Sequence, residues 1–238
     1  MTGRKKAIII RKTHRYLGIF LGIQFLFWTG SGLYFSWTNL DEIHGDHFKN
    51  PEYTPEFHTN LLGIDKLNIT KGVQQIALRT IGKQPYYWVN EEQLFNAITG
   101  EEKKGITQEE ALRIAEAHMK SSLKVKNIQR IISAGPHHEY REKPLPAYVI
   151  SYFHNDAVKA YVSEADGSFQ TVRHRSWRWF DFLWMTHTMD YESRDNFNTL
   201  VLRAFSLMGL RTVCSGFVLW SVSSPTLRKI LKRRKNTS

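Results

Sequence analysis

The stretch "RKTHRYLGIFLGIQFLFWTGSGLYFSW", residues 11–37, decides how the rest of the chain is interpreted. Its segment from Tyr16 to Trp37 has 22 residues and carries no charge. As a helix it is about 33 Å long, enough to cross the hydrocarbon core of a bilayer. A cleaved signal peptide is the alternative, but its apolar region has only about 7–15 residues and small residues follow it. The bulky ending "LYFSW" favours a retained transmembrane helix at 16–38.

A second apolar segment, residues 198–222, is predicted to return the chain across the membrane. It contains Arg203 near one end and Arg211 well inside the span. An arginine at that depth needs a partner, and haem propionates, backbone carbonyls or a carboxylate of another protein would serve. A buried core helix is the alternative, but the basic sequence "RKILKRRK" that follows is typical of the cytoplasmic flank of a span.

The net charge of +11 is concentrated in two tails. Residues 1–15 and 228–235 hold six basic residues each and no acid, which leaves 21 basic residues against 22 acidic ones elsewhere. Positive tails beside apolar segments indicate that both termini are cytoplasmic and that the middle of the chain is extracytoplasmic. The same distribution argues against a nucleic-acid partner, because the excess charge lies only beside the spans. The lone cysteine, Cys214, excludes disulfides from the middle.

The region between the spans is predicted to be an α+β domain at 39–175. Two similar halves, about 61–104 and 105–173, each read as a helix followed by an antiparallel meander. The helices would start after threonines in "ITKGVQQIALRT" (69–80) and "ITQEEALRIAEAHM" (106–119), and Thr107 with Glu110 has the capping-box spacing. The remaining segments are basic tails at 1–15 and 223–238 and an amphipathic interfacial helix at 176–197.

Three parts of the sequence resemble a known family. "PAYVISYFHNDAVKAYVSEADGSFQTV" is similar to the PepSY signature, and the segments beginning "THRYLGIFLG" and "WMTHTMDYES" look like the first and the return helix of the PepSY-associated transmembrane family. The resemblance implies a PepSY-like domain held between two spans in the bacterial cytoplasmic (inner) membrane. Larger members have four or more spans and include ferric-siderophore reductases that resemble b-type cytochromes.

His14 lies where the basic tail meets the first span, and three interpretations stay open. Gly18 and Gly22 continue its helical face, and this small-xxx-small pattern is typical of helix pairing, which predicts a homodimer. A histidine beside glycines also suits haem, with the imidazole on the iron and the macrocycle against the glycines. The third interpretation is an ordinary interfacial histidine.

The sequence "DEIHGDH" after the first span offers Asp41, His44, Asp46 and His47. His44 and His47 are three residues apart and would face one way on a helical turn, a pattern that suits a transition metal ion. Either histidine would also serve as an axial haem ligand. The alternative is a polar helix exit without a ligand.

Among the histidines, His187 is the preferred candidate for a cofactor-binding residue. It shares a predicted helical face with four aromatic residues, namely Trp177, Phe180, Trp184 and Tyr191. Pairing of His187 with His44 or His47 would hold haem b on the outer side within one chain, with His14 and Arg211 as further cofactor-binding candidates.

Two functions follow as hypotheses. No nucleophile elbow, Walker loop, dinucleotide fingerprint or HExxH motif is present, so a self-contained hydrolase or kinase is not expected. The first hypothesis is a haem- or metal-binding component of inner-membrane iron and siderophore reduction, working with a membrane or periplasmic partner. The second is a non-enzymatic PepSY module without a cofactor that modulates a periplasmic partner such as a peptidase.

Overall fold

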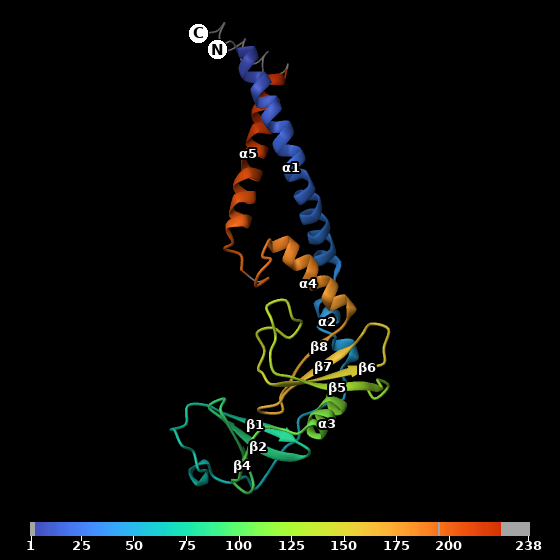
Figure 1. Cartoon of the computed structure of the whole chain (residues 1–238), viewed down its shortest axis with the longest axis vertical. Coiled ribbons are helices and arrows are strands. Elements are labelled where there is room, and N and C mark those ends of the chain that lie inside the picture. Colours follow the sequence, from blue (N-terminus) through green and yellow to red (C-terminus); the bar gives the residue numbers. More distant parts are fainter. Residues whose placement is uncertain (1–2, 195, 225–238) are drawn as a thin grey trace. The chain divides into compact units, whose positions relative to one another are not determined.

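The computed structural model describes residues 3–194 and 196–224 and divides the chain into two compact units. The helical unit consists of Met1–Trp37 and Asp181–Ser238, and the central unit consists of Thr38–Phe180. Figure 1 shows the elements of both. The predicted middle domain at 39–175 falls inside the central unit. The predicted basic tail at 223–238 lies outside the described residues from residue 225 onward.

Two long helices, α1 (Gly3–Trp37) and α5 (Leu200–Ser223), run side by side in the helical unit (Figure 1). Both are long and apolar enough to cross a membrane, over Ile8–Trp37 and Leu200–Ser221. Only 11% and 6% of their most apolar windows are buried, whereas the core helix of a soluble domain would be mostly buried. The contact between them includes stacked rings of Phe20 and Phe205 at 5.8 Å. The two predicted apolar helices are therefore confirmed as helices.

The helix predicted at 176–197 is shorter than expected. Helix α4 spans Arg175–Thr188, and Met189 follows it with a φ of 53°. The carboxylate of Asp190 then accepts hydrogen bonds from the backbone N–H groups of Glu192, Ser193 and Asn196. This local turn competes with the helical hydrogen bonds, as aspartate side chains commonly do. Tyr191 consequently lies outside the helix and does not share a helical face with His187.

The central unit contains two four-stranded antiparallel meanders, each in sequence order. The first comprises β1 (Ile76–Ile81), β2 (Gln84–Val89), β3 (Gln93–Asn96) and β4 (Glu102–Lys103). The second comprises β5 (Val125–Ile131), β6 (Ala147–Tyr152), β7 (Lys159–Ser163) and β8 (Phe169–Arg173). Short helical segments precede them at α2 (Leu40–Ile43), η1 (Asp46–Phe48) and η2 (Ile64–Lys66). The α+β class and both meanders are confirmed.

The predicted helix of the second half is present, but that of the first half is wrong. Helix α3 (Gln108–His118) begins at Thr107, whose side chain forms a complete capping box with Glu110. In the first half, residues 70–75 are irregular and β1 follows directly. The side chain of Asn90 accepts from the N–H groups of Gln74 and Gln75 and donates to the carbonyl of Gly72. These bonds hold the segment against the β2–β3 turn and replace the helical ones.

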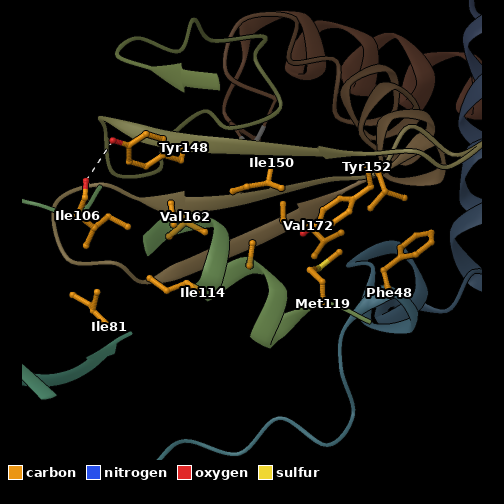
Figure 2. Packing of buried hydrophobic residues seen from close by; sticks show 14 of the residues in the cluster. Phe48, Ile81, Ile106, Ile114, Met119, Tyr148, Ile150, Tyr152, Val162 and Val172 are labelled. Atoms are coloured by element: carbon orange, nitrogen blue, oxygen red, sulfur yellow. Dashed lines mark hydrogen bonds between the residues drawn. The ribbon is translucent and has the colours of Figure 1, made fainter. Parts of the chain in front are cut away.

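A shared core joins the two sheets. Ile114 and Met119, from α3 and its C-terminal end, lie against Ile150 and Val172 on the strands of the second sheet (Figure 2). Ile81 of β1 belongs to the same cluster, and Arg79 of β1 forms an ion pair of 2.8 Å with the buried Asp166 before β8. The two halves therefore fold as one unit.

Gly167 marks the closest approach of the two halves. Its φ is +69°, and a Cβ there would lie 3.0 Å from Ile81 and 3.2 Å from Ile114. We expect Gly167→Ala to lower the free energy of unfolding by about 1–3 kcal/mol, because the left-handed backbone alone costs about 1–2 kcal/mol for an L-residue. Denaturant unfolding followed by tryptophan fluorescence measures this.

Gly135→Ala is the matched control. No atom lies within 4 Å of its Cβ position, and it has no positive φ, so a change of at most about 0.5 kcal/mol is expected. Equal stability of the Gly167 and Gly135 variants would contradict the close contact between the halves.

Candidate functional site

His187 lies in the last turn of α4, and a hydrogen bond fixes its ring. Its Nδ1 is 2.7 Å from the Oγ of Ser31 on α1. The Ser31 hydroxyl also lies 3.1 Å from the carbonyl of Trp28, and a neutral His187 that carries its proton on Nδ1 lets both contacts form at once. Nε2 is then unprotonated, and it has no hydrogen-bond partner among the described residues. This tautomer is the one that ligates a metal ion through Nε2.

Two further side chains of α1 hold the end of α4. The indole N–H of Trp28 donates to the carbonyl of His187 at 2.6 Å, and the Nε2 of Gln24 donates to the carbonyl of Thr186 at 3.3 Å. The last carbonyls of a helix have no partner within the helix, and leaving them unpaired in an apolar environment is costly. Gln24 and Trp28 thus have a structural reason to be polar within an apolar helix.

Aromatic rings and a glycine surround the imidazole of His187. Its ring centroid lies 5.4 Å from that of Trp28 and 5.5 Å from that of Phe35. A Cβ at Gly32 would lie 3.7 Å from its Cε1. Burial lowers the pKa of His187 below its ordinary value, which favours the neutral imidazole that binds metals.

His14 has the same arrangement on a different pair of helices. Its Nδ1 is 2.7 Å from the Oγ of Ser215 on α5, and the Ser215 hydroxyl donates to the carbonyl of Thr212 at 2.7 Å. A proton on Nδ1 of His14 would let both contacts form at once, as at Ser31. A Cβ at Gly216 would lie 3.5 Å from the Cε1 of His14.

We call each Ser-Gly pair that receives a histidine ring a histidine seat: Ser31-Gly32 for His187 and Ser215-Gly216 for His14. His14 and Ser31 are 17 residues apart on α1, or about 25 Å along the helix, so the seats lie toward opposite ends of the span. Sequence reasoning missed both serines. The signal was the dipeptide "SG", which occurs once in each apolar segment.

There is room for a side chain at the glycines of α1 near His14. No atom lies within 4 Å of a Cβ placed at Gly18 or Gly22, and the glycine against the His14 ring is Gly216 of α5. Both Gly18 and Gly22 are partly buried. The homodimer through Gly18 and Gly22 stays a prediction.

The residues of "DEIHGDH" do not form one helical turn. Helix α2 ends at Ile43, His44 is its C-cap, and Gly45 has a φ of 79°. His47 belongs to the separate turn η1, where it packs against the rings of Phe48 and His174. The prediction that His44 and His47 share a helical face is wrong because the left-handed glycine ends the helix between them.

The predicted metal-ligating residues do not form a metal-binding cluster in the described structure. Within residues 3–194 and 196–224, no group of three or more His, Cys, Asp or Glu side chains is arranged to hold a metal ion. Asp46 instead forms an ion pair with Lys49 at 2.6 Å, and Asp41 is exposed. The pairing of His187 with His44 or His47 joins residues of different units, so it stays a prediction.

Arg211 lies midway along α5 and is exposed. Across the described residues it has no hydrogen-bond or ion-pair partner, and it shares no hydrogen bond with either histidine seat. The prediction that Arg211 needs a partner stays a prediction.

Each unit also contains a cavity. In the helical unit, an apolar cavity of about 320 Å³ is bordered by Gln24 and Trp28, which also hold the end of α4. In the central unit, a polar cavity of about 550 Å³ is lined by charged side chains and by His118.

Comparison of the chain with protein-family models, with curated proteins and with solved structures finds no match. The PepSY resemblance therefore stays a prediction from the residues quoted above.

Proposed function

We propose that the chain is an integral protein of the bacterial inner membrane, with both termini in the cytoplasm and the central unit outside. The two long apolar helices and the basic flanks in the sequence support this placement. The open aromatic and aliphatic surface of both helices also fits a lipid environment, since Phe20, Ile23, Leu26 and Phe217 are each at least 60% exposed.

We further propose that the helical unit binds haem b through the Nε2 of His187 and takes part in reducing ferric-siderophore iron. The observation that carries this proposal is the seat of His187, where Ser31 contacts Nδ1 and leaves Nε2 without a hydrogen-bond partner among the described residues. The aromatic rings of Trp28 and Phe35 around the imidazole support it, because a haem needs apolar groups near its axial ligand. Haem would supply one-electron chemistry, and the chain itself supplies the oriented imidazole.

The second seat extends the proposal. His14 has the matching contact with Ser215 toward the other end of α1, so a second haem or a shared inner site would use its Nε2. Without a nucleotide-binding motif in the sequence, electrons would come from a partner protein or from quinol.

The test is the reduced-minus-oxidised absorption spectrum of the full-length protein, purified in mild detergent from cells supplied with a haem precursor. The proposal predicts the bands of a b-type haem. A protein that is inserted in the membrane but shows no haem absorption bands would contradict the proposal.

A second candidate function is a membrane-anchored binding module that modulates a periplasmic partner such as a peptidase. The cavity of the central unit favours it, because Lys83, Arg113, Glu52 and Glu56 line it with both signs of charge. His118, another lining residue, stacks between Tyr53 at 3.9 Å and Phe169 at 4.6 Å. Charges of both signs together with aromatic rings suit recognition of a peptide segment.

The fragment 38–180 separates the two functions. It has its own core and is expected to fold alone. If the fragment forms a stable complex with a periplasmic peptidase while the full-length protein is colourless, the module is favoured. If the full-length protein contains haem and the fragment binds no peptidase, the redox proposal is favoured.

A further inference from the structure

One face of α5 is exposed along most of its length and carries a charge at its centre. Leu207, Arg211, Cys214 and Val218 follow one another at intervals of four, three and four residues. Leu207 and Val218 are 53% and 46% exposed, and Arg211 and Cys214 are also exposed. Residues at this spacing form the contact line along which one helix packs against another in a left-handed pair. We call these four residues the Arg211 face.

Exposing this face to lipid costs free energy because Arg211 lies near the middle of the span. It lies 11 residues after Leu200 and 10 before Ser221, or about 15–17 Å from either end of the span. Arginines reach the membrane surface most readily from positions near helix ends. Because Arg211 also lacks a partner among the described residues, its guanidinium would be an uncompensated charge near the membrane centre.

A second copy of the chain does not supply the missing charge. Neither Ile8–Trp37 nor Leu200–Ser221 contains an Asp or Glu. Pairing of two Arg211 faces would bring two guanidinium groups together. The compensating anion must therefore come from a different molecule.

We propose that the Arg211 face docks a transmembrane helix of another protein, one that carries an Asp or Glu at mid-membrane depth. A carboxylate pairs with guanidinium through two parallel hydrogen bonds, which gives register as well as energy. The small side chain of Cys214, one turn from Arg211, permits the close approach that membrane helices need. This proposal rests on the proposed membrane placement, but not on haem binding.

The test uses the full-length protein in phosphatidylcholine vesicles. The probe is a polyleucine transmembrane peptide with one central Glu and one Cys a turn away, compared with the same peptide carrying Leu in place of Glu. Oxidation would join the peptide to Cys214, the only cysteine of the chain. We expect about tenfold more crosslinked product with the Glu peptide, since a polar pair between membrane helices contributes about 1–2 kcal/mol in model peptides.

Variants assign the effect to Arg211. Arg211→Leu should reduce crosslinking of the Glu peptide to the level of the Leu peptide, and Arg211→Lys should retain most of it. Arg203→Leu is the matched control on the same helix and should leave crosslinking unchanged. Cys214→Ser should abolish the product altogether.

Two results would overturn the proposal: equal crosslinking of the Glu and Leu peptides, or full crosslinking in Arg211→Leu. Loss of the Glu preference when anionic phosphatidylglycerol is added would assign Arg211 to lipid phosphate and would also overturn it. Flotation of the vesicles provides the separate check on membrane placement. Protein that floats without a Glu preference contradicts only the docking proposal, whereas protein that does not float contradicts the membrane placement itself.

Discussion

Replacing Glu139 with glutamine should lower the free energy of unfolding of the central unit by about 2–4 kcal/mol. The carboxylate accepts hydrogen bonds from Arg178 at 2.7 Å, Lys159 at 2.6 Å and the Tyr161 hydroxyl at 2.7 Å. Its side chain is only 11% exposed, so its removal leaves two cations next to the buried Tyr161. Because both cations are about one-third exposed, the expected cost lies toward the low end of the range for buried pairs.

Denaturant unfolding measures this loss, and Glu142→Gln is its control. Glu142 is an exposed residue in the same loop, so its substitution should change stability by no more than about 0.5 kcal/mol. A Glu139→Gln variant as stable as the Glu142 control would show that the three contacts contribute nothing.

Glu139 also gives the stability of the central unit a defined pH dependence. Burial alone would raise its pKa, but the hydrogen bonds from Arg178, Lys159 and Tyr161 prevail and lower the pKa from 4.5 to about 2. In acid, the unfolded chain therefore binds a proton that the folded chain does not. The contribution is complete above about pH 5 and is lost as the pH falls through the interval from 4.5 to about 2. Unfolding curves of Glu139→Gln should lack this part of the acid destabilisation.

His187→Ala should abolish the haem absorption proposed for its site, because the substitution removes the only imidazole held by Ser31. Ser31→Ala keeps the ligand but removes the group that contacts its Nδ1, so haem affinity should fall about 10–100-fold. Haem titration of the purified protein, followed by the Soret band, measures both effects.

His137→Ala is the control for this series, because His137 is an exposed histidine of the central unit. It should keep the wild-type spectrum. If His187→Ala also keeps that spectrum, His187 is not a ligand. The predicted second ligand is tested in the same way, since whichever of His44 and His47 supplies it should change the spectrum when replaced by alanine.

The sequence predicted those parts of the fold in which local signals and packing agree. Thr107 and Glu110 are sufficient to cap α3, and alternating apolar residues with Gly100 and Gly167 at the turns predict the meanders. The failures occurred where a side chain offered the backbone another partner. Hydrogen bonds with the Asn90 side chain replace those of the helix expected after residue 69. Hydrogen bonds to the Asp190 carboxylate end α4 nine residues before the expected boundary.

The candidate site was only partly predictable for a related reason. His187 and His14 stood out because each is a histidine next to an apolar segment. Their partners did not, because Ser31 and Ser215 are ordinary small residues in a membrane helix until the packing of α1 against α4 and α5 is known. In "DEIHGDH", by contrast, the signal is visible in the sequence. Gly45 lies between His44 and His47, and a glycine is the residue that most readily ends a helix.

The most direct test of the account is the membrane topology of single-cysteine variants in a Cys214→Ser background. Ser121→Cys places a thiol on an exposed position of the central unit, and Lys12→Cys places one in the basic segment before the uncharged stretch 16–37. A membrane-impermeant maleimide applied to cells with a permeabilised outer membrane should label Ser121→Cys, and should label Lys12→Cys only after the inner membrane is disrupted. Labelling of Lys12→Cys in intact inner membranes, or protection of Ser121→Cys, would contradict the two-span arrangement on which both proposed functions depend.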